Sequence, residues 1–202
     1  MKWVSVGPVS VPTSWAAIVS AFLITGAYLF ITKKKAASDW YGNAIFTFIV
    51  TWKLSVILFY LKMTLANPLN ILYFNGGVKG YGLGILGALL YTVLSKRRSV
   101  IGFSEAMLSW IITVSVYELV YGILNEEAII MIIIQFLVNL VLVVLNIIKT
   151  PDRKWLMQIM VLFTSMQGLF YTLKADLFSL PMATYGLLAI FFYFWRKRGD
   201  DQ

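Results

Sequence analysis

Long apolar runs separated by short polar segments repeat along the chain. A helix needs about 20 mostly apolar residues to cross roughly 30 Å of hydrocarbon. Seven stretches reach or approach this length, and the third and seventh are short: residues 14–32, 43–63, 80–94, 103–122, 128–148, 155–173 and 180–195. The loops between them are too short to fold alone. The pattern therefore predicts an all-α, polytopic membrane protein with about seven transmembrane helices in a single domain, residues 1–202.

Basic residues follow the first, third, fifth and seventh apolar stretches. Twelve of the 17 lysines and arginines lie in four short segments, at 33–35, 96–98, 149–154 and 196–198. Cytoplasmic loops carry an excess of Lys and Arg, so these segments place the N-terminus outside and the C-terminus in the cytoplasm. An odd number of spans predicts the same arrangement. The net charge of +8 therefore reflects orientation, and we expect no nucleic-acid partner.

The first apolar stretch has a second interpretation, as a secretory signal peptide. Its basic residues follow the apolar run, however, whereas a signal peptide carries them in front. No small-residue cleavage site is evident before Lys33. We therefore expect a retained first span.

The composition excludes several classes of chemistry. The chain is 60% hydrophobic and 13% charged, with a mean hydropathy of +0.81, whereas soluble domains carry roughly a quarter charged residues. It contains no cysteine and no histidine, which removes disulfides, thiolate nucleophiles, and the commonest general base and metal ligand. A soluble catalytic domain is excluded, and we predict no metal site and no cofactor.

Lys53 lies at the midpoint of the second apolar stretch. A lysine at the centre of a bilayer costs several kcal/mol unless it meets an acid, water or an anionic ligand. One interpretation makes Lys53 a phosphate-binding cation in a lipid cavity. The other pairs it with Glu118, which lies inside the fourth stretch, or lets its amino group reach the interface. The sequence favours neither, and Glu118 needs a polar partner in either case.

Asn125, Glu126 and Glu127 form a short predicted turn after the fourth stretch. Paired carboxylates can perform acid/base chemistry. A solvated turn between two spans explains adjacent glutamates more simply, so we interpret Glu126 and Glu127 as turn residues.

Residues 75–87 are unusually rich in glycine. Three of these glycines spell GxGxxG, but no strand precedes them and the following helix is apolar, so a dinucleotide site is not expected. Gly80 and Gly84 are spaced for close helix packing. A second interpretation adds an anion site, because glycines at a helix N-terminus leave backbone N–H groups accessible and Lys79 lies beside them. Packing is the favoured interpretation.

Several motifs occur in an informative order. A Gly-Pro pair at residues 7–8 precedes the first span, and Lys53 lies inside the second. Gly76-Gly77 then opens the glycine-rich third span, which ends in a basic turn. In order and spacing, these segments resemble the prolipoprotein diacylglyceryl transferase family as far as about Asn125, and beyond that point the likeness is compositional.

Members of that family are bacterial enzymes that transfer diacylglycerol from phosphatidylglycerol to the lipobox cysteine of a lipoprotein. The resemblance implies a multi-pass protein of the bacterial plasma membrane, with seven spans and an external N-terminus. It also implies a phosphatidylglycerol-like phospholipid as ligand, and it places Lys53 where the family has an intramembrane arginine.

The departures from the family fall on its reactive positions. Tyr81, followed by Gly82, stands where the family has a histidine, and the signature arginine is missing from the segment that keeps Asn125. An arginine that clamps phosphate bidentately is not exchanged without losing that role. The resemblance therefore implies a catalytically degenerate relative without catalytic residues, in which phosphate binding falls to Lys53, Lys79, Tyr81, Gly82 and Asn125.

Three functions remain open on this basis. The leading one is a non-catalytic accessory subunit that binds phospholipid or another membrane protein, and it predicts a lipid-sized cavity into which Lys53 points. The second is an active phosphatidylglycerol-dependent diacylglyceryl transferase with rearranged catalytic residues. The third is a transporter or channel subunit lined by Lys53 and Glu118, against which stand the few intramembrane ionisable residues and the lack of an internal repeat.

Overall fold

A computed structural model of the chain describes residues 2–6, 9–69, 71, 74, 76–95, 101–148 and 153–200. Within these ranges, only the backbone is described for Val6, Val9, Arg153 and residues 196–200. The Gly-Pro pair at 7–8 and the basic turn at 96–98 lie outside the described residues, so the expectations attached to them remain predictions.

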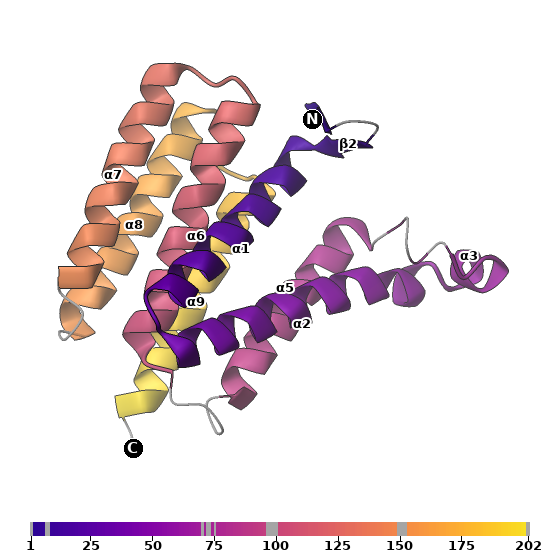
Figure 1. Ribbon diagram of the computed structural model, residues 1–202, viewed down its shortest axis with the longest axis horizontal. Helices are drawn as coiled ribbons and strands as arrows, with labels where there is room; N and C mark the ends of the chain where they lie inside the picture. The colour runs from indigo at the N-terminus through magenta and orange to yellow at the C-terminus, as the bar shows by residue number, and fades with distance from the viewer. Residues whose placement is uncertain are drawn as a thin grey trace. The chain divides into compact units, whose positions relative to one another are not determined.

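The described residues form a short hairpin followed by helices (Figure 1). In chain order the elements are β1 Trp3–Val6, β2 Val9–Pro12, α1 Thr13–Ile31, α2 Lys35–Phe59, α3 Leu61–Ala66, α5 Gly77–Ser95, α6 Phe103–Leu124, α7 Ile129–Ile148, α8 Arg153–Leu173 and α9 Leu180–Asp200. Apart from the hairpin the architecture is helical, as the hydrophobic pattern predicts.

Six of these helices are long and apolar enough to cross a membrane, namely α1, α2, α5, α6, α7 and α8. The apolar part of α9 is shorter and covers Leu180–Trp195. The described helices are therefore consistent with a helical, multi-pass membrane protein. The crossing number of seven and the external N-terminus remain predictions.

The second helix differs from its predicted bounds. It begins at Lys35, well before residue 43, and its first turns bury Ala37, Trp40 and Tyr41. A search for continuous apolar residues misses this part because its helix is amphipathic. The helix then ends at Phe59, since Tyr60 leaves the helical conformation with φ −132° and ψ 45° before α3 begins.

A short N-terminal hairpin accompanies the predicted helices and was not itself predicted. β1 and β2 pair antiparallel, with Val4 opposite Val11 and Ser5 opposite Ser10. β-Branched valines suit an extended backbone. Two four-residue strands are too short to give a clear alternating signal, which explains why the hydrophobic pattern did not reveal them.

The chain forms two compact units, one made of Met1–Lys33 with Gly102–Gln202 and the other of Lys34–Ile101. The first unit is built around α6, which is buried along much of its length and contacts α1, α7 and α8. α1 faces α6 with the small buried residues Ala17, Ala21 and Thr25, one per turn. The Thr113 hydroxyl donates to the Thr25 hydroxyl at 3.2 Å, so small side chains and a hydrogen bond join the two helices.

The second unit is built on the packing of α2 against α5. A Cβ added at Gly84 would lie 3.0 Å from the carbonyl oxygen of Phe48, and one at Gly87 would lie 2.8 Å from Thr51 Oγ1. Gly80 is buried against Ser55 and Trp52. Glycine therefore lets the two backbones approach closely, which confirms the predicted packing role of Gly80 and Gly84.

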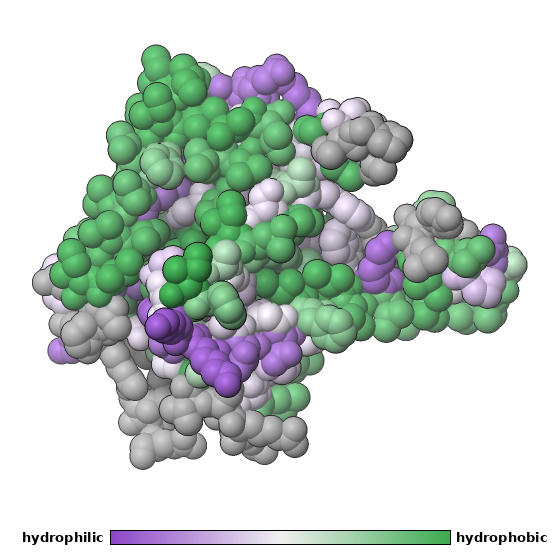
Figure 2. All heavy atoms as spheres, viewed as in Figure 1, coloured by the Kyte–Doolittle hydropathy of each residue, from purple (hydrophilic) through white to green (hydrophobic). Residues whose placement is uncertain are grey.

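α7 exposes isoleucine, leucine, valine and phenylalanine along most of its length. The region of α7 is correspondingly green in Figure 2. A soluble protein rarely exposes so extended an apolar surface. In a bilayer the same surface contacts lipid tails, so this face supports the membrane assignment.

Candidate functional site

Lys53 reaches toward the start of α5. It is half-buried on α2, and its Nζ donates to the backbone carbonyl of Phe74 at 3.4 Å. Phe74 lies just before the first turn of α5, which begins at Gly77. The prediction that Lys53 lies at the midpoint of the second span is wrong, because α2 runs from Lys35 to Phe59 and Lys53 lies less than two turns from its end. From there the side chain is directed to the segment that leads into the glycine-rich helix.

Lys79 lies in the first turn of α5 and is exposed. Its Nζ is 5.9 Å from the centre of the Phe59 ring, at the end of α2. Lys53 and Lys79 are therefore both held at the same end of the α2–α5 pair, although they are far apart in sequence.

The start of α5 adds its own positive potential to these lysines. The first N–H groups of a helix have no partner within it, and the helix dipole favours negative charge there. The first turn contains no acidic residue. Gly77 has φ 60°, a conformation that glycine adopts readily and other residues seldom do. This end of the second unit has the electrostatic character of an anion site.

Tyr81 and Gly82 differ in their surroundings. The Tyr81 ring contacts Phe48 and Trp52 edge-on, with ring centres 5.5 Å and 6.1 Å apart. Gly82 is exposed, and a Cβ built there meets no atom within 4 Å. Tyr81 is therefore anchored beside the helix that carries Lys53, while Gly82 offers accessible backbone on the opposite side from the packing glycines.

Asn125 belongs to the first unit, where its side chain closes the end of α6. It donates to the carbonyl of Tyr121 at 2.9 Å and accepts from the Thr13 hydroxyl at 3.2 Å. These bonds tie the end of α6 to the beginning of α1. The structure thus groups Lys53, Lys79, Tyr81 and Gly82 within one unit and gives Asn125 hydrogen bonds in the other.

Glu118 lies at the centre of a buried polar cluster and is 2% exposed. The Tyr185 and Tyr171 hydroxyls donate to its Oε1 at 2.5 Å and 2.8 Å. Gln135 Nε2 donates to Oε2 at 3.2 Å, and Lys174 Nζ lies 3.9 Å from the same oxygen. The polar partner that Glu118 requires is therefore supplied by α7, α8, α9 and the loop before α9, so it does not depend on Lys53.

The cluster continues through amide side chains. Gln135 Nε2 also donates to Gln167 Oε1 at 3.0 Å, and Gln167 Nε2 donates to Asn139 Oδ1 at 2.7 Å. All three side chains are buried. Hydrogen bonds among polar groups hold membrane helices together, because the alternative is an unsatisfied group in hydrocarbon.

Gln135 and Asn139, two of these partners, were not among the predicted site residues. Gln135, Asn139 and Asn146 interrupt a very apolar stretch at intervals of four and seven residues. That spacing places them on one face of α7, where all three are buried. The periodicity of polar residues inside an apolar helix was therefore a usable signal for the cluster.

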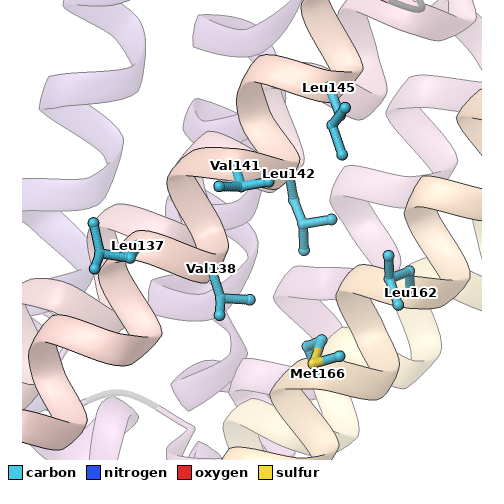
Figure 3. Close-up of a pocket in the computed structure, with 7 residues that line it drawn as sticks. All are labelled: Leu137, Val138, Val141, Leu142, Leu145, Leu162 and Met166. Atoms are coloured by element: carbon cyan, nitrogen blue, oxygen red, sulfur yellow. The ribbon is translucent and has the colours of Figure 1, made fainter.

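A shallow groove of about 330 Å³ lies between α7 and α8 (Figure 3). Its lining is entirely aliphatic apart from one methionine: Leu137, Val138, Val141, Leu142, Leu145, Leu162 and Met166. Such a lining accommodates hydrocarbon and offers no polar group for orientation. Lys53 is not among these residues, so this groove is not the cavity that the lipid hypothesis predicts around Lys53.

The loop end of the first unit carries a second set of charges. Lys2 Nζ lies 2.9 Å from Glu126 Oε2 and also donates to the Asn125 carbonyl at 2.9 Å. The hydrogen bond that Lys2 Nζ donates to Glu126 Oε2 and the positive charge of Lys2 lower the pKa of Glu126. Glu126 thus lies in the expected turn, and its ion pair with Lys2 also connects the residue before β1 to the end of α6.

Comparison with known proteins gives no identification. The chain matches no protein family model, no curated protein sequence and no solved structure. The class of protein is therefore inferred only from its apolar helices. Its function is inferred from the residues described in this subsection.

Proposed function

We propose that this chain is a non-catalytic, multi-pass membrane protein that binds an anionic phospholipid through the start of α5, as an accessory subunit on a diacylglyceryl transferase-like scaffold. The observation that carries the proposal is the direction of Lys53, whose Nζ lies 3.4 Å from the Phe74 carbonyl beside the start of α5. A helix N-terminus with two lysines is suited to a phosphodiester headgroup. Phosphatidylglycerol is the proposed lipid because the family resemblance implies it.

The surroundings of Lys53 support binding more strongly than catalysis. The aromatic rings of Trp52 and Tyr81 lie in contact, and aromatic side chains are common where lipid headgroups meet hydrocarbon. The chain has no histidine or cysteine to activate a thiol substrate at neutral pH. We therefore propose that the scaffold retains a lipid or presents it to a partner in the plasma membrane of a bacterium.

The test is lipid retention by variants purified in mild detergent. Native mass spectrometry should detect phosphatidylglycerol on the wild type, and Lys53→Gln should weaken its binding about tenfold, as expected for loss of one charge-assisted contact. Lys53→Arg should retain most of the affinity. Lys62→Gln is the matched control, because Lys62 is an exposed lysine on the neighbouring α3.

Equal losses in Lys53→Gln and Lys62→Gln would show that only surface charge attracts the lipid, and the proposal would fail. A separate assay addresses turnover. Purified protein mixed with phosphatidylglycerol and a lipobox peptide should release no glycerol phosphate, while an active transferase in parallel should do so. Release by this protein would replace the non-catalytic assignment with the transferase one.

A further inference from the structure

Lys174 places its ammonium group among four polar and aromatic groups in the first unit. Its Nζ lies 2.8 Å from Glu127 Oε2, 3.4 Å from Gln135 Oε1 and 3.9 Å from Glu118 Oε2. It also lies 5.6 Å from the centre of the Tyr171 ring. These groups come from α6, the turn after it, α7 and α8, so only the folded bundle brings them together. They surround a cation from several directions.

Glu118 presents a carboxylate to this ammonium. The tyrosine hydroxyls of Tyr185 and Tyr171 donate to Oε1, and Gln135 Nε2 donates to Oε2. The same amide group of Gln135 turns its oxygen toward Lys174. Three hydrogen-bond donors therefore face the two oxygens of Glu118. The Lys174 ammonium lies on the side of Oε2, at 3.9 Å.

The balance of charge in this cluster favours a cation. Glu118 and Glu127 share the single ammonium of Lys174. The aromatic face of Tyr171 adds a cation–π contact, which suits an ammonium group. A divalent metal usually takes several oxygen ligands, and the described residues hold no group of three His, Cys, Asp or Glu side chains arranged for one. The cluster is therefore matched to an ammonium group.

The lysine that fills this position is carried by a partly exposed loop. The side chains of Lys174 and Glu127 are 19% and 20% exposed. The next residue, Ala175, has φ 55°, a left-handed conformation that is unfavourable for alanine. The N–H groups of Ala175 and Asp176 donate to the carbonyls of Thr172 and Tyr171, so this conformation closes the end of α8. The partial exposure of Lys174 and Glu127 leaves this side of the cluster accessible from outside the bundle.

We propose that Glu118, Glu127, Gln135 and Tyr171 form a primary-ammonium site, which the chain's own Lys174 occupies and which an external primary ammonium fills when Lys174 withdraws. The ligand is defined by its chemistry, which the ethanolamine headgroup of a phospholipid and a small soluble amine share. This site belongs to the first unit and does not depend on the phosphate site proposed for the second unit.

The test replaces the tethered ammonium with a free one. Lys174→Ala in detergent should lose about 5–10 °C in its thermal midpoint, because a buried carboxylate is left without its counter-ion. Millimolar ethylammonium chloride should restore at least half of that loss, and sodium chloride at the same concentration should not. Lys2→Ala is the matched control, since it removes an ammonium from the exposed ion pair with Glu126. Ethylammonium should leave its midpoint unchanged.

Two further arms complete the test. The double variant Lys174→Ala with Glu118→Gln should no longer respond to ethylammonium. In lipid nanodiscs without soluble amine, a Lys174→Ala protein that is more stable in phosphatidylethanolamine than in phosphatidylglycerol would identify the lipid headgroup as ligand, whereas rescue by ethylammonium alone would identify a soluble amine.

Absence of rescue in every arm, equal rescue of Lys2→Ala, or persistent rescue in the double variant would overturn the proposal. If Lys174→Ala does not fold, Lys174→Gln provides the same measurements, because its neutral amide also removes the charge. Lipid retention by Lys53 variants is unaffected by any of these outcomes, so the two proposals fail separately.

Discussion

Tyr185 donates a hydrogen bond of 2.5 Å to Glu118, although the two residues are 67 positions apart in the chain. The bond joins α9 to α6 within the interior of the first unit. Tyr171 from α8 donates to the same carboxylate oxygen at 2.8 Å. One carboxylate therefore holds three helices together, and its partners can be removed one at a time.

Tyr185→Phe should lower the free energy of unfolding by about 1.5–3 kcal/mol, the usual range for a hydrogen bond to a charged group. Tyr193→Phe is the matched control, because Tyr193 lies on the same helix and is 53% exposed. Thermal or chemical unfolding in detergent measures both. A Tyr185→Phe protein as stable as Tyr193→Phe would contradict the importance of the bond.

Gly84→Ala should weaken the packing of α2 against α5 by about 1–3 kcal/mol, since overpacking of a close contact costs this much. The new Cβ would lie 2.9 Å from a ring carbon of Phe48 and 3.0 Å from its backbone oxygen. Gly82→Ala should instead be neutral or stabilising, because its Cβ meets nothing within 4 Å and alanine favours a helix. Opposite signs in an unfolding assay would confirm the interface.

The ion pair between Lys2 and Glu126 should make stability depend on pH in the acid range. The hydrogen bond and the positive charge that Lys2 supplies lower the pKa of Glu126 in the folded protein. A depressed carboxyl pKa contributes stability that is present above the unfolded value, about 4.3 for glutamate. That contribution is lost as the pH falls through the folded value.

An NMR titration of the Glu126 carboxyl carbon checks this expectation. The midpoint should lie below that of an ordinary glutamate in the wild type, and it should rise in Lys2→Met. Identical midpoints in the two proteins would show that Lys2 does not interact with Glu126 in solution.

The predicted orientation can be tested directly because the chain has no cysteine. Glu126→Cys places a thiol in the turn after α6, and Lys34→Cys places one just after α1. If the N-terminus is outside, a membrane-impermeant maleimide should label Glu126→Cys in intact cells. It should label Lys34→Cys only after the membrane is permeabilised. The reversed labelling pattern would invert the topology.

The candidate lipid site was accessible to sequence reasoning only in part. Lys53 stood out because a charge inside an apolar run is costly, and Lys79 because it accompanies a cluster of glycines. That both lie at the same end of the α2–α5 pair follows from the contact of Lys53 with the Phe74 carbonyl and of Lys79 with the Phe59 ring. No local pattern specifies such a contact, because it depends on how two helices cross.

The Glu118 cluster shows even more clearly which features the sequence predicts and which depend on helix packing. The sequence indicated that an intramembrane glutamate requires a partner, and it offered Lys53 for that role. In the structure, the partners of Glu118 are instead three hydrogen-bond donors and one ammonium group: Tyr171, Tyr185, Gln135 and Lys174. Tyrosines and lysines near the ends of apolar stretches look interfacial in any one helix, and only packing shows which of them turn inward.

By itself, the sequence predicted the helical character and the approximate bounds of the long helices, and the six long apolar helices of the structure are consistent with the membrane class that it also predicted. These properties depend on local chemistry, since about 20 consecutive apolar residues must satisfy their own backbone hydrogen bonds in lipid. The tertiary structure decided which helices pair, where the short hairpin forms and which polar side chains meet. Those outcomes depend on contacts between residues far apart in the chain, and the energy of each contact exists only after the helices have packed.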